Sequence, residues 1–180
     1  MGKYTNIGHV VYVSVTFFVF MTAFQTTRNQ IESETEQNDF GELGAVSLAL
    51  IYLFVMLSSF FSALIVLSIG QRMAFFTAAS MYTIWVWSSL MIVYNVYHPA
   101  TWVVICITSA LNGFGGALLW VSQGSYLTDC SNANNRGFYN GLFWLIYQCS
   151  QVPSFFMLRS LEISSLPSWW KFLESRVSLM

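Results

Sequence analysis

Long stretches of the sequence carry no charged side chain, and they dominate its pattern. No Lys, Arg, Asp or Glu occurs within residues 4–27, 43–71, 73–128 and 137–158. Runs inside them, such as Leu48 to Leu57, are apolar on every side and do not alternate with polar residues. A helix of about 20 mostly apolar residues crosses the hydrocarbon core of a membrane. The pattern therefore predicts membrane-spanning helices and excludes a β-barrel, whose strands alternate.

The third stretch, residues 73–128, is long enough for two helices. Asn95 to Pro99 divides it, because a proline disfavours helix at the preceding residue, here His98. The expected fold class is an all-α integral membrane protein with about five transmembrane helices. The predicted spans cover residues of about 8–27, 44–69, 74–96, 101–127 and 137–158.

The first predicted span also has features of a secretory signal peptide. Lys3 precedes an apolar run from Val10 to Phe24. Gln25 to Arg28 then follows, where a cleaved signal would have a small-x-small site. We therefore expect an uncleaved first helix, with Arg28 in the loop after it.

Composition narrows the class of protein further. Of the 180 residues, 56% are hydrophobic and 8% are charged, and the formal net charge is −1. A soluble domain carries about 25% charged residues. These values exclude an ordinary cytosolic enzyme, a disordered chain and a basic nucleic-acid-binding protein. The expected environment is the lipid bilayer, crossed several times.

Basic residues predict the orientation, because Lys and Arg are enriched in cytoplasmic loops. Lys3, Arg72 and Arg136 fall on the side of the N-terminus, and Arg28 falls on the other side with several acidic residues. This favours a cytoplasmic N-terminus. Three more basic residues in the segment 159–180 reverse the count, so the preference holds only if that segment is discounted.

The pattern divides the chain into a membrane domain, residues 1–158, and a tail, residues 159–180. The tail is too short and too interrupted by polar residues to span a membrane. Trp169 and Trp170 would anchor it as a membrane-surface segment. An unrelated terminus left by truncation is the alternative, and both interpretations stay open.

Small residues recur at a spacing of four on two predicted helices. Ser109, Gly113 and Ala117 form one such row, and Gly137 and Gly141 form another. Lipid gives helices no hydrophobic reason to associate, so small residues serve close packing between them. We predict helix packing for both rows and favour it over a direct ligand site.

Two helix faces combine amide and aromatic side chains. Such faces avoid lipid and turn toward protein or a watery cavity. One hypothesis is that they line a central cavity or a partner-binding groove. The other is that the amides bond neighbouring helices as structural glue. The candidate residues are Asn112, Trp120 and Gln123 on the fourth span, with Gly116 between them, and Asn140, Trp144, Gln148 and Gln151 on the fifth, with Tyr147 between them.

No pattern in the sequence indicates catalysis. No ionisable residue sits at the middle of a predicted span, so a proton relay is not indicated. No nucleophile accompanies a base, and no phosphate-binding loop or metal-ligand spacing occurs. Cys106, Cys130 and Cys149 are scattered and fit small packing residues. The sequence predicts no enzyme, no metal and no cofactor.

Several motifs resemble the uncoordinated-93-like family of the major facilitator superfamily. The specific part is the glycine-rich segment Leu111 to Thr128, which ends in Gln123-Gly-Ser-Tyr-Leu127. Shorter similar stretches extend the resemblance over about residues 10–152, namely residues 20–29, 44–52, 135–137 and 141–144.

This resemblance implies part of the first six-helix half of a major facilitator fold, with a cytoplasmic N-terminus. Family members include regulators that associate with potassium channels and proteins that escort Toll-like receptors sensing nucleic acids. Many have no known substrate, and none is an enzyme. The resemblance therefore implies a membrane-protein partner or self-association, and no nucleic acid.

Two departures shape the functional hypothesis. A full superfamily member has two six-helix halves with the substrate site between them, whereas about five helices are predicted here. Gly70-Gln-Arg72 also lacks the Asp of the superfamily's Gly–Asp–Arg signature. We expect association with other membrane proteins in channel or receptor regulation or trafficking, or a truncated relative without independent activity. The alternatives are a facilitator-type solute transporter that needs a second half, and a structural subunit of a membrane complex.

Overall fold

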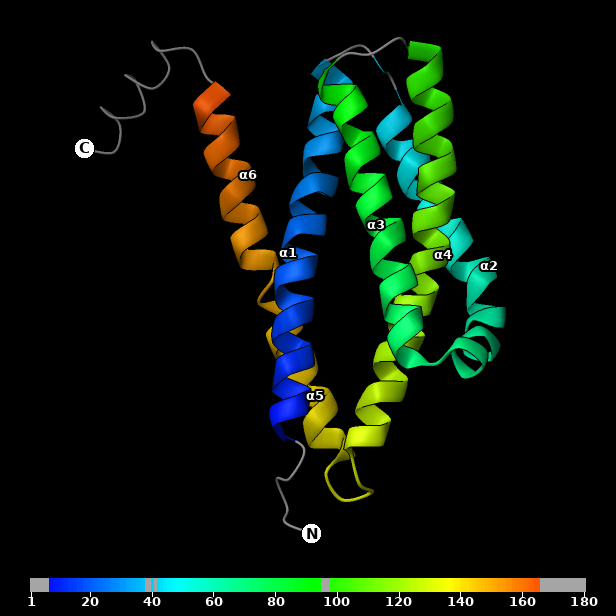
Figure 1. Cartoon of the computed structure of the whole chain (residues 1–180). Helices are drawn as coiled ribbons and strands as arrows, with labels where there is room; N and C mark the ends of the chain where they lie inside the picture. The colour runs from blue at the N-terminus through cyan, green and yellow to red at the C-terminus, as the bar shows by residue number, and fades with distance from the viewer. Residues whose placement is uncertain (1–6, 38–39, 41, 95–97, 166–180) are drawn as a thin grey trace, which may run out of the picture.

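The computed structural model describes residues 7–37, 40, 42–94 and 98–165, and every regular element in these ranges is an α-helix (Figure 1). The expected all-α membrane fold is confirmed, because the four helices α1 to α4 are each long and apolar enough to cross a membrane. The arrangement fits part of a major facilitator fold. The six helices are α1 (Ile7–Gln37), α2 (Leu43–Ile69), α3 (Gln71–Val93), α4 (His98–Cys130), α5 (Arg136–Gln148) and α6 (Gln151–Ser165).

The first helix is longer than its apolar pattern predicted. Helix α1 continues ten residues past Thr27, and its candidate membrane span reaches Ile31. The added segment is rich in Glu, Gln and Arg, which are good helix formers, and it contains neither Gly nor Pro. The placement of Arg28 in a loop was therefore wrong, because loss of apolar character marks the edge of the membrane and does not end a helix.

The fifth predicted span, residues 137–158, is not one helix. It is divided into α5 and α6 by a turn at Cys149 and Ser150. Pro153 lacks the N–H that would bond the carbonyl of Cys149, and its ring would crowd that carbonyl. The chain closes tighter bonds instead, from Ser150 N to Tyr147 O at 2.9 Å and from Val152 N to Cys149 O at 3.3 Å. Figure 1 shows α5 and α6 following each other along α1.

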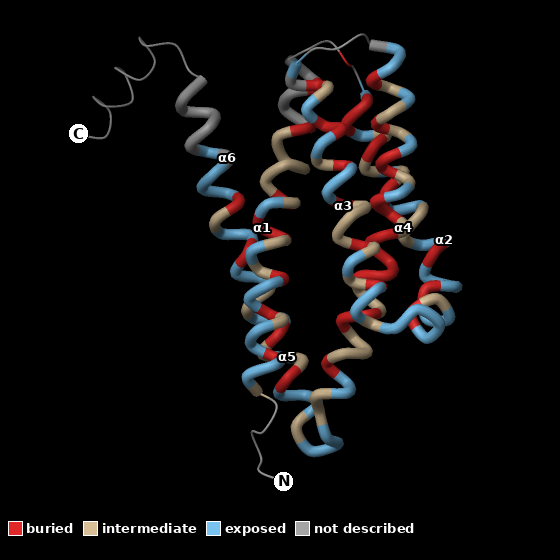
Figure 2. The backbone as a smooth tube through the Cα atoms, in the orientation of Figure 1, coloured by how far each residue is buried: buried red, intermediate tan, exposed pale blue. Residues whose placement is uncertain are grey.

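Helix α4 is the centre of the bundle. In its most apolar stretch 56% of the residues are buried inside the bundle, against 22–33% for α1, α2 and α3. Pro99 lies in its first turn, where a missing N–H leaves no helical bond unmade. Figure 2 shows buried residues gathered where α4 meets α2 and α3, while the outward sides are exposed. Helices α2 and α3 both pack along α4.

Glycines allow this close packing of α4. A Cβ atom added at Gly113 would collide with the carbonyl oxygen of Ile51 and lie 2.7 Å from Phe54 Cβ, both on α2. A Cβ at Gly115 would lie 3.0 Å from Met81 Cβ on α3. The approach at Gly113 requires a residue without a side chain, and at Gly115 a Cβ would be tolerated only if Met81 shifted slightly. The glycine-rich part of α4 therefore sets the distance to both neighbours.

Hydroxyl groups join the same three helices inside the bundle. The Ser47 and Ser109 hydroxyl oxygens lie 2.7 Å apart, and Trp85 Nε1 donates to Ser109 Oγ at 3.0 Å. Next to this pair, Ser88 Oγ of α3 and Thr108 Oγ1 of α4 lie 2.8 Å apart. Interhelical bonds of this kind hold membrane helices in register.

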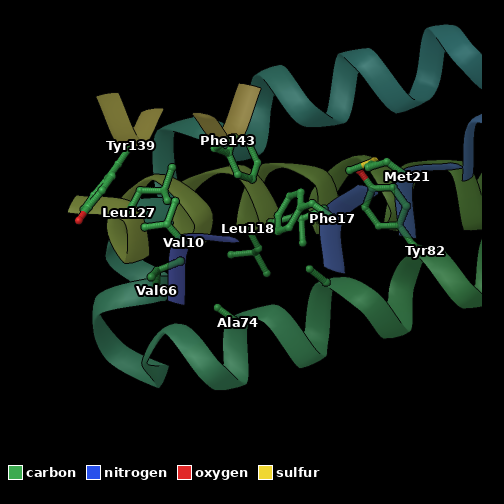
Figure 3. Close-up of a cluster of buried hydrophobic side chains, with 12 residues drawn as sticks. Val10, Phe17, Met21, Val66, Ala74, Tyr82, Leu118, Leu127, Tyr139 and Phe143 are labelled. Carbon is green, nitrogen blue, oxygen red and sulfur yellow. The ribbon is translucent and has the colours of Figure 1, made fainter. Parts of the chain in front are cut away.

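Aromatic side chains attach α1 and α5 to this core. Phe17 meets Phe143 edge-to-face with centroids 5.2 Å apart, and Phe24 meets Tyr82 with centroids 4.8 Å apart. Figure 3 shows the buried cluster around Phe17, which lies between Leu118 of α4 and Phe143 of α5. At the end of the bundle, Gln71 Nε2 donates to Asp129 Oδ2 at 2.6 Å and ties the start of α3 to the end of α4.

The glycine contact predicts a large effect of one methyl group. We expect Gly113→Ala to lower the free energy of unfolding by about 1–3 kcal/mol, because the backbone of α2 must move away. Gly137→Ala is the matched control, since a Cβ there meets no described atom within 4 Å. Thermal unfolding in detergent measures both variants, and equal midpoints for the two would contradict the packing.

Candidate functional site

A cavity of about 230 Å³ is lined by residues of all six helices and reaches the surface at the exposed Tyr52 and Gln151. Most of its wall is apolar or aromatic, with residues such as Phe24, Ile51 and Trp120. Polar side chains complete the wall at Gln25 and Gln151 and at further positions described below. Mostly apolar pockets with a few polar groups are the usual form of a small-molecule site.

Helix α1 contributes the polar part of the wall that the sequence interpretation missed. Gln25 is 8% exposed, and Arg28 is half-buried. Arg28 Nη1 donates to the Tyr52 hydroxyl of α2 at 3.3 Å. The spacing of Met21, Gln25 and Arg28 puts them on one helical face. That face was visible in the sequence, but the assumption that α1 ended at Thr27 hid it.

The two predicted amide and aromatic faces meet in part. The Trp120 and Trp144 rings are stacked, with centroids 5.7 Å apart and planes at 9°. Tyr147 stands edge-on to Trp120 at 5.3 Å. Trp120, Tyr147 and Gln151 line the cavity. Trp144 is 47% exposed and Gln148 is exposed, so these two lie on the outer surface of α5.

The other candidates on these faces lie away from the cavity. Asn112 is fully buried, and its side-chain oxygen and nitrogen have no hydrogen-bond partner among the described residues. Gln123 is buried and does not line the cavity. Asn140 Nδ2 donates to the Arg136 carbonyl at 3.0 Å, a bond within α5. Of the residues on the two predicted faces, Trp120, Tyr147 and Gln151 line this cavity. The roles of all of these residues stay predictions.

The two rows of small residues also lie in different surroundings. Ser109, Gly113 and Ala117 are buried on α4, where Ser109 and Gly113 contact α2 directly. Gly137 and Gly141 are exposed, and a Cβ on either would meet no described atom within 4 Å. Packing of the second row stays a prediction that needs a neighbour outside the described part of the chain. Within that part, no three His, Cys, Asp or Glu side chains gather as a metal site.

A break in a membrane helix frees carbonyl groups, and side chains from two helices bond them. Ser154 Oγ donates to the Ser150 carbonyl at 3.1 Å, and Thr22 Oγ1 on α1 lies 3.5 Å from the same oxygen. Without water, such bonds compensate a broken helix. The turn between α5 and α6 is therefore supported by α1, beside the cavity-lining residues Tyr147 and Gln151.

Comparison with known proteins gives the family. The family model described as "Ion channel regulatory protein UNC-93" matches residues 40–158, about two thirds of the chain. The chain belongs to the UNC-93 family. The resemblance inferred from the segment Leu111 to Thr128 is thereby confirmed, and the chain is an integral membrane protein.

Curated relatives of this UNC-93 family member come from animals and plants. UNC93-like protein MFSD11 of Xenopus tropicalis is 30% identical over 80% of this chain, and protein unc-93 homolog A of Xenopus laevis is 32% identical over 82%. UNC93-like protein 3 of Arabidopsis thaliana is 28% identical over 84%. The chain spans about a third of each relative, 31–32% of its length. No solved structure matches the chain.

The buried hydroxyl network of this family member gives a second prediction. Ser109→Ala removes the acceptor of the Trp85 indole and leaves a buried N–H unpaired, so we expect a loss of about 1–3 kcal/mol in unfolding free energy. Ser59→Ala is the control, because its exposed hydroxyl bonds only the Val55 carbonyl of its own helix. Denaturant titration in mixed micelles compares them, and a loss at Ser59 as large as at Ser109 would contradict the network.

Proposed function

We propose that this chain acts by association with other membrane proteins, as a regulatory protein of the UNC-93 kind and not as an enzyme. The observation that carries the proposal is the outer surface of α5, where Trp144 and Gln148 are exposed. We call these two residues the α5 face. Lipid offers no partner to an amide group, and an unpaired amide in hydrocarbon is costly.

The outward side of α2 differs from the α5 face in its chemistry. Its exposed residues include Leu53, Met56, Phe60 and Leu64, all apolar. Lipid tails cover such a surface without cost, so it needs no protein partner. The contrast makes the α5 face the surface of this chain that further membrane helices are expected to cover. The family description names an ion channel regulator, and we propose a channel or receptor as the partner class.

We also propose that the N-terminus is cytoplasmic. Arg72 at the start of α3 and Arg136 at the start of α5 are both exposed. Figure 1 shows the beginning of α1, the α2–α3 turn and the α4–α5 loop at the same end of the bundle. The Gln71–Asp129 bond connects two of these segments. With the segment 159–180 discounted, these two arginines against Arg28 at the other end support a cytoplasmic assignment for this end.

A facilitator-type solute transporter is the second candidate function, and the central cavity favours it. The cavity touches all six helices, which suits a solute site. Transport by rocking two halves against each other would require a second set of helices. The relatives are about three times as long as the chain. In a transporter, the α5 face would contact further helices of the same polypeptide. The two candidate functions therefore predict different cross-linked products.

Site-specific cross-linking tests the association. A photoreactive residue in place of Gln148 should form protein adducts in native membranes, because the α5 face is covered by protein. The same residue in place of Leu64 should form lipid adducts only, since the outer side of α2 faces lipid. Mass spectrometry identifies the products. Lipid adducts alone at both positions would overturn the proposal, and adducts within one longer polypeptide would favour the transporter.

A further inference from the structure

The central cavity has one charged wall residue, and that residue is a cation. Arg28 lines it, and no Asp or Glu whose side chain the structure describes does so. The other polar groups of the wall are amides and hydroxyls, from Gln25, Tyr52, Tyr147 and Gln151. Each of these can donate a hydrogen bond. The wall is therefore built to receive negative charge.

Arg28 lies near the end of the candidate span of α1, Ile7 to Ile31. An arginine at this depth either extends to the membrane surface or faces protein. The Arg28 side chain is half-buried and lines the cavity. The Arg28 guanidinium donates a hydrogen bond to the neutral hydroxyl of Tyr52 at 3.3 Å. Among the described side chains of this wall, no carboxylate therefore compensates the positive charge of Arg28.

Gln25 gives a second, independent indication of a ligand. It precedes Arg28 by one helical turn and is 8% exposed, so it is more than nine-tenths buried. It also lines the cavity, and its amide has no hydrogen-bond partner among the described residues. A buried polar group without a partner costs free energy unless a bound molecule or water pairs with it.

The remaining wall sets the size and character of the ligand. Phe24, Tyr82 and Trp120 supply aromatic surface, and Ile51 and Val55 supply aliphatic surface. A volume of about 230 Å³ corresponds to roughly eight water molecules at about 30 Å³ each. This space suits a small molecule with one apolar body.

We propose that the cavity binds a small amphipathic carboxylate, with the carboxylate on Arg28 and the apolar body against the aromatic wall. Guanidinium and carboxylate match in planar, two-bond geometry, and such charge-assisted bonds are the strong ones. Gln25 and the Tyr52 hydroxyl complete the anion site from α1 and α2. The three anion-binding groups, on Arg28, Gln25 and Tyr52, lie on α1 and α2 and are therefore separate from the α5 face.

Binding of radiolabelled phenylacetate to the purified full chain in nanodiscs tests the proposal. Saturable binding is expected, and phenylacetamide, the uncharged analogue, should compete at least about tenfold more weakly because it lacks the charge. Arg28→Gln should weaken phenylacetate binding at least about tenfold. Arg136→Gln is the matched control, since it removes an exposed arginine at the end of the bundle and should leave binding unchanged.

Tyr52→Phe is a second variant that keeps the ring and removes only the hydroxyl. We expect it to weaken phenylacetate binding by about threefold to tenfold, in line with loss of one hydrogen bond. It keeps the test decisive if Arg28→Gln does not fold. The proposal is overturned by absence of saturable binding to the folded wild type, by equal competition from phenylacetamide, or by full binding in folded Arg28→Gln.

Discussion

The close approach of the α4 backbone to α2 is the contact on which the rest of the structure depends. At Gly113 the two helices are too near for a Cβ, and at Gly115 the same helix meets α3 almost as closely. This proximity brings the Ser47 and Ser109 hydroxyls within 2.7 Å, so the helices are held in register without charged groups. Helices in lipid gain nothing from burying apolar surface, so contact distance and hydroxyl bonds decide which helices associate.

Helices α1 and α5 pack less closely against the bundle than α2 and α3 pack against α4. Helices α1 and α5 join through aromatic rings, which keep backbones apart, and the cavity lies where these rings meet α2 and α4. Arg28, near the end of the candidate span of α1, lines this space. Glycines thus bring helices together around α4, and aromatic contacts leave room for the cavity beside α1 and α5.

The helices and the family could be predicted from the sequence for physical reasons. Stretches without charged residues indicate membrane-spanning helices, and the predicted bounds of α2 agree with the structure to within one residue. The glycine-rich segment of α4 carried the family resemblance. Two helix bounds were predicted wrongly. The fifth span is divided just before Pro153, and α1 continues through the polar segment that begins at Arg28. Equal spacing also could not separate the buried Gly113 from the exposed Gly137, because spacing gives a face and not the neighbour it meets.

A disulfide between α2 and α4 tests the central contact most directly. Cysteines in place of Ser47 and Ser109, with Cys106, Cys130 and Cys149 changed to Ala, should cross-link efficiently in membranes, because the two hydroxyl oxygens lie 2.7 Å apart. A protease site in the α2–α3 turn reveals the link as fragments that separate only after reduction. Ser68 and Ser109 form the control pair, since Ser68 is about 30 Å along α2 from Ser47. The account predicts a link for the first pair alone; no link there, or equal links in both pairs, would contradict it.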